Sequence, residues 1–156
     1  MTILAIPQQF VTNLIDISHV TSELVLRPIG WVESPVTDPS EAARQGDEGT
    51  PDSWLVLDAD VRPAIDGLKP DDDIVALTWL HLADRTVLRV HPRGDTSRPM
   101  RGVFATRSQH RPNPLGIHQV TVRAIDDLRI QVRGLEAIDR TPIIDIKPAL
   151  EPRGQR

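Results

Sequence analysis

The segment GIHQVTVRAIDDLRIQVRGL, residues 116–135, constrains the fold more than any other part of the chain. Apolar and polar residues alternate on both sides of an Asp-Asp pair, and a period of two is typical of strands with one buried face. A three-residue loop at 125–127 pairs 124 with 128, 122 with 130 and 120 with 132. All of the apolar side chains then point one way, so the sequence predicts a β-hairpin with one apolar face and one arginine-rich face.

Six further stretches have strand-like patterns: residues 23–34, 52–60, 73–82, 85–92, 101–106 and 141–148. The stretch 73–82, DIVALTWLHL, is almost continuously apolar, which favours burial on both faces. VRPAIDGLKP predicts a short helix, and SEAARQ predicts one helical turn within a long loop. About eight strands with little helix predict an all-β fold, a small closed or partly open barrel.

The chain of 156 residues is expected to form one domain. We expect an N-terminal arm at 1–22, a barrel domain at 23–150 and a tail at 151–156. No apolar run approaches the roughly 20 residues of a membrane helix, and the N-terminus lacks the features of a secretory signal. With no cysteine there is neither a disulfide nor a thiolate nucleophile, and a cytoplasmic location is expected.

Charge is distributed unevenly around a net value of −4. Residues 33–73 contain twelve acidic and three basic side chains, whereas 85–111 contains seven arginines against Asp95. Sixteen of the eighteen basic residues are arginine, which binds phosphate and carboxylate in a planar, bidentate geometry. Two interpretations remain open: solvated strand faces, or a basic surface for an anionic ligand or an RNA backbone.

The most unusual motif is SQHRPNPLG, residues 108–116. Pro112 and Pro114 fix their own backbone angles and keep Arg111 and Asn113 extended, so that both side chains are presented at low entropic cost. Gly116 allows a backbone or a ligand to come close. The motif is equally compatible with a rigid connection between strands.

Other types of site find less support. The sequence contains no GxGxxG motif, and Ser108 lacks the GxSxG context of a hydrolase nucleophile. The histidines lack metal-ligand spacing, so no metal site is expected. Two further clusters, ARQGDEG at 43–49 and RGLEAIDRTPIIDIKP at 133–148, carry polar groups near strand ends, either for ligand binding or for ordinary salt bridges.

Together these motifs resemble the TrmO/TsaA-like (YaeB-like) S-adenosylmethionine-dependent methyltransferases, from LRPIGWVESP to IIDIKP, with GVFATRSQHRPNPLGIH and GLEAIDRTPIIDIKP the most specific pieces. The resemblance implies a small β-barrel, usually a homodimer, with S-adenosyl-L-methionine bound near the dimer interface. It also implies methylation of N6 of threonylcarbamoyl-adenosine beside the anticodon of tRNA(Thr).

The resemblance also assigns residues by motif position. The implied cofactor-binding residues are Gly46, Asp47, Glu48, His81, Leu82, Ala83, Arg107, Ile117, Arg133, Gly134, Leu135 and Glu136. Those that shape this site or bind substrate are Arg111, Asn113, Asp145 and Lys147. An arginine such as Arg107 suits the carboxylate of the methyl donor, and a carboxylate such as Glu136 suits its ammonium group or ribose. His110, which flanks the motif, is the candidate general base.

Some features keep other acceptors open. The chain has no tyrosine and only two phenylalanines, Phe10 and Phe104, so platforms for base stacking are scarce. Gln109 stands where the family often has proline or threonine. The alternatives are a methyltransferase of the same fold that acts on a small molecule, or a non-catalytic barrel that binds an adenosine ligand or RNA.

Overall fold

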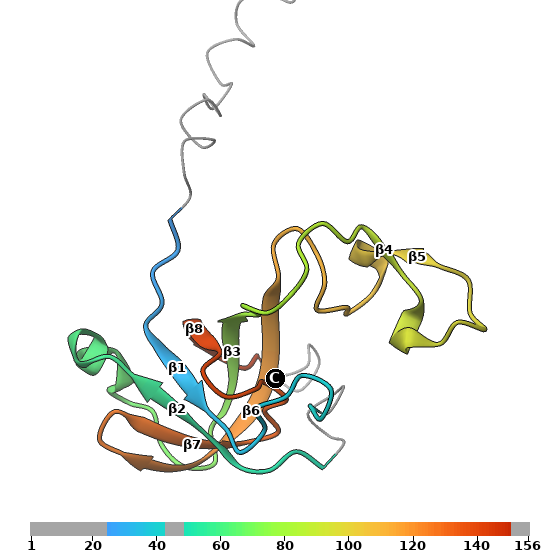
Figure 1. The fold of residues 1–156 in the computed structure, drawn as a ribbon. Coiled ribbons are helices and arrows are strands. Elements are labelled where there is room, and N and C mark those ends of the chain that lie inside the picture. Colours follow the sequence, from blue (N-terminus) through green and yellow to red (C-terminus); the bar gives the residue numbers. More distant parts are fainter. Residues whose placement is uncertain (1–24, 43–48, 151–156) are drawn as a thin grey trace, which may run out of the picture.

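Six strands form a closed barrel in the computed structural model, which describes residues 25–42 and 49–150 (Figure 1). Around the ring the strands follow the order β1-β2-β7-β6-β3-β8, and every neighbouring pair is antiparallel. Their bounds are β1 Gly30–Glu33, β2 Ser53–Leu57, β3 Asp73–Trp79, β6 Leu115–Asp126, β7 Arg129–Arg133 and β8 Pro142–Pro148. The predicted all-β barrel is confirmed.

The barrel interior is filled by alternate residues of these strands. Val32, Leu55, Ile74, Ile130 and Ile143 are each at most 1% exposed. Burial of such side chains stabilises a fold by about 1.5–3 kcal/mol each. In β3 the buried residues alternate with half-buried ones, so the prediction that this stretch is buried on both faces was too strong. β3 lies between β6 and β8 in the barrel wall. Its outward-facing side chains are only half-buried, because the described residues do not cover them completely.

The hairpin of β6 and β7 exists, but its turn differs from the prediction. Asp126 pairs with Arg129, which leaves a two-residue turn at 127–128 in which Asp127 has a φ of 53°. The register then shifts between Val122 and Ala124, and this β-bulge brings Val122 opposite Val132. The bulge absorbs one residue, so the apolar face is kept with a shorter turn than strict alternation predicts.

Residues 80–114, here called the arm, project from the barrel between β3 and β6 (Figure 1). Strands were predicted at 85–92 and 101–106, but the arm contains only a two-residue ladder of β4 Arg89–Val90 and β5 Arg101–Gly102. Short 3₁₀-helices follow each of these strands, η3 Pro92–Gly94 and η4 Val103–Ala105. Pro92 and the Arg98–Pro99 pair interrupt the hydrogen-bonding pattern, so longer strands cannot form.

Three other expectations need correction. The first strand is shorter than predicted, because residues 25–29 are not in a strand. The short helix is the 3₁₀-helix η2, Ala59–Ile65, with Pro63 inside it. Residues 39–42 form a turn rather than helix, and the rest of SEAARQ lies outside the described residues. The predicted N-terminal segment 1–22 and C-terminal tail 151–156 also lie outside the described residues, so the domain boundaries stay predictions.

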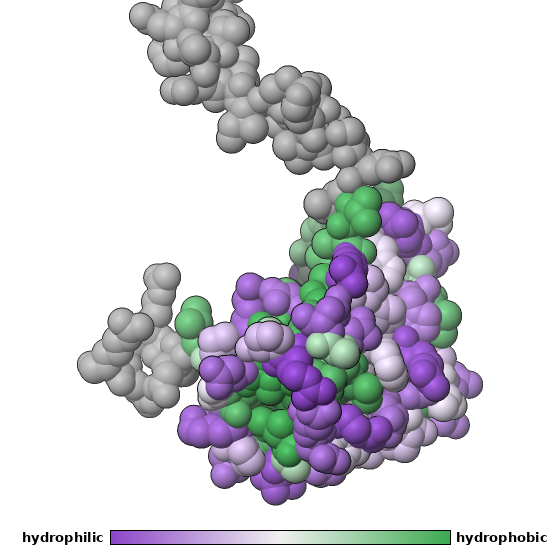
Figure 2. Space-filling view, turned by 90° about the vertical axis from the view of Figure 1, so that its left-hand side faces the viewer, coloured by the Kyte–Doolittle hydropathy of each residue, from purple (hydrophilic) through white to green (hydrophobic). Residues whose placement is uncertain are grey.

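A cavity of about 870 Å³ opens at the end of the barrel that carries η2. Its apolar lining includes Ile29, Ile65 and Ile146, and aspartates 66, 71, 72, 73 and 145 are also among its lining residues. Figure 2 shows apolar side chains gathered in the middle of one face with hydrophilic ones around them. None of the helices in the described part of the chain has the length and apolar content that a membrane span requires.

Candidate functional site

Three segments open at the barrel end opposite η2: the segment after β1, described at 34–42 and 49–52, the arm, and the loop 134–141. They follow β1, β3 and β7, which run in the same direction because neighbouring strands are antiparallel. The first segment and the loop 134–141 are joined directly, since the Asp139 amide donates to the Val36 carbonyl at 2.7 Å and the Ser34 amide donates to the Asp139 carboxylate at 3.1 Å.

Most of the predicted cofactor residues lie at this end. The arm carries His81, Leu82, Ala83 and Arg107, the start of β6 carries Ile117, and the end of β7 and the following loop carry Arg133, Gly134, Leu135 and Glu136. Gly46, Asp47 and Glu48 lie outside the described residues. The structure therefore places these segments, which are distant in sequence, at one barrel end.

A small pocket of about 180 Å³ lies between the two joined loops. Leu135, Glu136 and Ala137 form one side, and the other side includes Val36, Ala42, Gly49, Thr50 and Pro51. Leu135 and Ala137 are buried, whereas the side chain of Glu136 is 24% exposed. Glu136 thus presents a carboxylate at a pocket with both polar and apolar walls, and Glu41 also lines this pocket.

A buried histidine lies directly behind this carboxylate. His118 in β6 is 4% exposed, and its Nδ1 lies 2.9 Å from Oε1 of Glu136. Its other ring nitrogen, Nε2, lies 2.8 Å from Oγ1 of Thr78 in β3. The approach between Nδ1 and Oε1 is too bent for a well-aligned hydrogen bond, so Nδ1 is a buried polar atom without an ideal partner among the described residues.

Gly116 makes room for this arrangement. A Cβ at position 116 would lie 2.5 Å from Nε2 of His118 and even closer to Oγ1 of Thr78. The predicted close approach at Gly116 is therefore an approach of two side chains inside the barrel. The predicted loop of 107–116 is also too long, because β6 already begins at Leu115.

The sequence interpretation missed His118, which it treated as one of several scattered histidines. A signal was present, because His118 stands two residues before Val120 and four before Val122. In a strand these three side chains share one face, so the apolar face of the hairpin already placed a histidine inside. Among the described residues, no three histidine, aspartate or glutamate side chains are grouped so that they could hold a metal ion.

Arg111 is used within the arm. Its Nε donates to the carbonyl of Ser108 at 2.8 Å, and its Nη2 donates to the carbonyls of Val103 and Thr106 at 3.2 and 2.7 Å. One guanidinium group thus donates to three backbone carbonyls of the same loop. Arg111 therefore shapes the loop that carries Arg107, whereas Asn113 is exposed.

Two more contacts join the start of the arm to its end. The Asp84 amide donates to Nδ1 of His110 at 2.9 Å, and Nε of Arg85 donates to the Pro112 carbonyl at 2.8 Å. The Arg85 guanidinium also lies 5.4 Å from the ring centre of Trp79. Hydrogen bonds from the side chain and backbone of Thr86 hold the pKa of Asp84 below its usual value. The proline motif is thus bound to the first residues of the arm.

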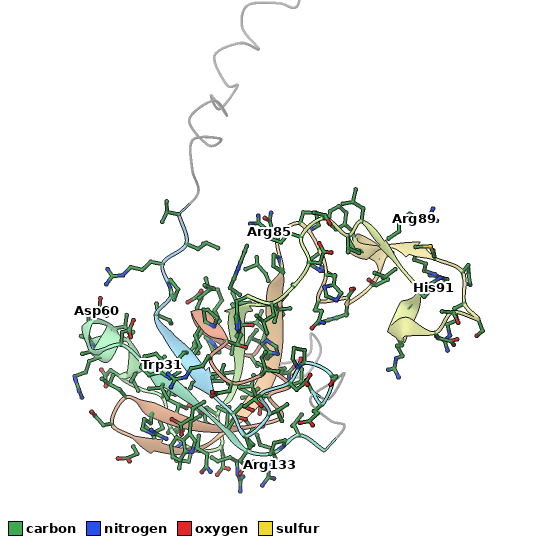
Figure 3. The ribbon with its side chains drawn as sticks, viewed as in Figure 1. Trp31, Asp60, Arg85, Arg89, His91 and Arg133 are labelled. Carbon is green, nitrogen blue, oxygen red and sulfur yellow. The ribbon has the colours of Figure 1, made fainter. Side chains whose placement is uncertain are left out.

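The arm is strongly cationic. Seven arginines against two aspartates give residues 80–114 a net charge of +5 with neutral histidines. Figure 3 shows Arg85, Arg89 and His91 along the arm and Arg133 on the barrel. Arg107 is exposed and makes no hydrogen bond or ion pair with the other described residues. A free guanidinium near the pocket end is suited to an anionic group.

Asp145 and Lys147 do not join this group. They are near the end of β8 and line the large cavity beside η2, and Nζ of Lys147 lies 2.8 Å from the Asp145 carboxylate. Of the residues that were predicted to shape the site, these two are therefore placed toward the opposite mouth of the barrel.

Several known proteins are similar to this chain in sequence. A probable S-adenosyl-L-methionine-binding protein of Methanothermobacter thermautotrophicus is 44% identical over 129 residues, which cover 83% of this chain and 92% of the relative. An S-adenosyl-L-methionine-binding protein of Archaeoglobus fulgidus is 38% identical over 124 residues, which cover 80% and 88%. Fold, site and relatives together define the class as barrel-type, S-adenosylmethionine-dependent methyltransferases.

The family model for the tRNA-methyltransferase O N-terminal domain matches residues 31–152, and the chain belongs to this family. The crystal structure of TrmO from Pseudomonas aeruginosa superposes with a TM-score of 0.66 at 27% sequence identity, covering 82% of this chain. The chain spans 56% of the length of that TrmO chain. The family resemblance and the methyl donor expected from the sequence are thereby confirmed.

Proposed function

We propose that the protein methylates N6 of threonylcarbamoyl-adenosine, beside the anticodon of tRNA(Thr). The observation that carries this proposal is the combination found at one barrel end. A carboxylate at a small pocket suits a cationic methyl donor, and a neighbouring arm of net charge +5 suits an RNA backbone. We also propose a cytoplasmic location, because it would fit methylation of a tRNA.

The described residues fit S-adenosyl-L-methionine. When bound, this group supplies a methyl that is already activated by a positively charged sulfur. Arg107 has a free guanidinium for the ligand's carboxylate, and Glu136 can accept hydrogen bonds from its ammonium group or its ribose hydroxyls. The protein then mainly has to hold the acceptor nitrogen in line with the methyl group.

The acceptor nitrogen has to lose one proton as it gains the methyl group. His110 was the candidate base, but its Nδ1 already accepts the Asp84 amide hydrogen. A neutral histidine with Nδ1 as acceptor carries its proton on Nε2, which then cannot accept another. His110 could act as a base only after release of the Asp84 amide, so it stays a prediction, and solvent is the simpler proton acceptor.

Binding of tRNA would rest mainly on the arginines of the arm. Phosphate contacts by arginine give strong binding that weakens as salt displaces the counterions. Phe104 is 84% exposed on the arm, where it could stack on a nucleotide base.

We also propose a homodimer. The exposed large apolar side chains of the arm and the start of β6 are Leu82, Leu88, Met100, Phe104, Leu115 and Ile117. Exposed apolar side chains of this size mark interaction surfaces when they form one patch. Because the arm and the loop that carries Glu136 open at the same barrel end, a second copy that covered these side chains would lie at that end.

The test uses the purified full-length chain, methyl-labelled S-adenosylmethionine and tRNA(Thr) with or without the threonylcarbamoyl group. Label that appears in the modified adenosine only in the first tRNA supports the proposal. Donor binding without label transfer to tRNA, but with transfer to components of a metabolite extract, would replace it with the small-molecule alternative. Absence of donor binding in calorimetry would contradict both.

A further inference from the structure

The buried contact between His118 and Glu136 has no part in the function described so far. We propose that His118 is a positioning residue, which holds Glu136 as a charged acceptor for the methyl donor. Thr78 donates to Nε2 of His118 and thereby keeps the ring proton on Nδ1, facing Glu136. This inference rests on the proposed function, in which Glu136 accepts hydrogen bonds from the ligand.

The chemistry of the two neighbours determines which ring nitrogen carries the proton. An ionised carboxylate can only accept, whereas a hydroxyl can donate or accept. With Glu136 2.9 Å from Nδ1 and Thr78 2.8 Å from Nε2, the neutral tautomer that satisfies both contacts has its hydrogen on Nδ1. The Thr78 hydroxyl then donates to Nε2.

Burial makes this arrangement rigid. Thr78 is fully buried and His118 is 4% exposed, and both side chains extend from paired strands of the barrel wall. Glu136 is in a loop, and among the described residues the contact with His118 is what connects its carboxylate to that wall. A preformed acceptor is bound by a ligand at a lower entropic cost than one that has to be ordered first.

The bent approach between Nδ1 and Oε1 agrees with this role. A small rotation of the Glu136 side chain would align the hydrogen bond, and catalytic or binding hydrogen bonds often tighten only when the ligand is present. We therefore expect the donor to strengthen the contact between His118 and Glu136 as it binds.

Calorimetry with S-adenosylmethionine tests the coupling between the two residues. We expect His118→Leu and Glu136→Gln each to raise Kd by about tenfold, which corresponds to about 1.4 kcal/mol. The double variant should be little worse than either single variant, because the two changes remove the same interaction. Additive losses would contradict a positioning role, as would an unchanged Kd in His118→Leu.

A conservative variant separates positioning from simple packing. The amide group of His118→Asn can still donate toward Glu136, so it should recover much of the affinity that His118→Leu loses. Thr121→Val is the matched control, because it removes a hydroxyl that donates to Asp73 at 2.6 Å on the same strand pair, away from the site. We expect Thr121→Val to bind the donor as the wild type does. Equal losses in His118→Asn and His118→Leu would overturn the proposal.

Nitrogen-15 NMR of the histidine rings gives a readout that needs no variant. Signals of His118 should show the hydrogen on Nδ1 in the free protein, and addition of donor should shift that hydrogen to lower field. An Nε2-protonated ring would overturn the proposal even if His118→Leu fails to fold. If the wild type binds no donor, the proposed function fails instead. If Glu136→Gln weakens binding but His118→Leu does not, this inference alone fails.

Discussion

Two arginines of one loop, four residues apart, have different environments. Arg111 donates to three backbone carbonyls within the arm, whereas Arg107 makes no hydrogen bond with the described residues. A guanidinium that donates its hydrogen bonds to the backbone supports its loop, whereas one without hydrogen bonds to the described residues is available to a ligand. The proline motif therefore combines a structural arginine with an available one.

Replacement of the available arginine should affect the ligand directly. We expect Arg107→Ala to weaken S-adenosylmethionine binding at least tenfold, about 1.4 kcal/mol, with little change in thermal stability. Isothermal titration calorimetry measures the first quantity and circular dichroism the second. Arg101→Ala is the control, because Arg101 is equally exposed on the arm and makes no side-chain contact with the described residues. A folded Arg107→Ala variant with unchanged affinity would refute the assignment.

A second residue-scale prediction concerns Asp95 in the arm. Hydrogen bonds from the side chain and backbone of Ser97 hold the pKa of Asp95 below its usual value. Since the folded state lowers this pKa, any stabilisation is present above the unfolded value of about 3.9 and is lost as pH falls through the folded value. In an NMR titration, Ser97→Ala should raise the pKa of Asp95. An unchanged titration would show that the hydroxyl is not the cause.

At the scale of elements, position 116 near the start of β6 has no room for a side chain. In Gly116→Ala the new methyl group would collide with Thr78 and His118, and both are buried in the barrel wall. We expect a loss of about 1–3 kcal/mol in the free energy of unfolding, measured by urea denaturation. Gly102→Ala is the matched control, since the nearest atom to its Cβ is the Leu88 carbonyl oxygen at 4.0 Å. Equal stability of the two variants would contradict the close approach.

The elements also show what could be predicted from the sequence. Inward and outward residues alternate clearly along β2 and β7, and both were predicted as strands. β8 was also predicted as a strand, although Ile143 is the one fully buried residue within it. Alternation misplaced the turn at 127–128, since a bulge at Arg123 is compatible with the same apolar pattern. In the arm, β-favouring residues such as Val87 and Leu88 suggested a long strand. Their neighbours do not form a two-sided apolar surface, and Pro92 ends the ladder.

The candidate site was predictable to the extent that motifs mark it. The family motifs identified Arg107 and Glu136, which the structure places at the same barrel end. Residues 118 and 136 come together through the register of the hairpin, because pairing Val122 with Val132 places position 118 opposite 136. The predicted pairing of 120 with 132 would have placed 118 opposite 134, so the bulge at Arg123 hid this contact from the sequence. Asp145 and Lys147 belong to a motif by sequence, yet strand geometry carries them toward the opposite mouth.

At the scale of the whole molecule, exposed apolar side chains and positive charge occupy the same arm. Large apolar side chains on a charged surface are costly in water unless a partner covers them. Phe104 is 84% exposed and Leu88 62%, and both are on the arm. A dimer that covers these side chains would leave the arginines for an RNA backbone, so the two proposed roles of the arm compete only at Phe104, which could either stack on a base or pack in the dimer.

The proposed dimer can be tested by a substitution on the arm that leaves the barrel unchanged. We expect Phe104→Glu to raise the dimer dissociation constant at least tenfold in sedimentation velocity experiments, because a carboxylate at a covered position would lose its hydration. Leu26→Glu is the control, since Leu26 is 41% exposed and precedes β1 rather than lying on the arm. A wild type that sediments as a monomer at all concentrations would contradict the homodimer. If Phe104→Glu remains dimeric while tRNA binding falls, Phe104 faces the nucleic acid instead, and the dimer must be formed by another surface.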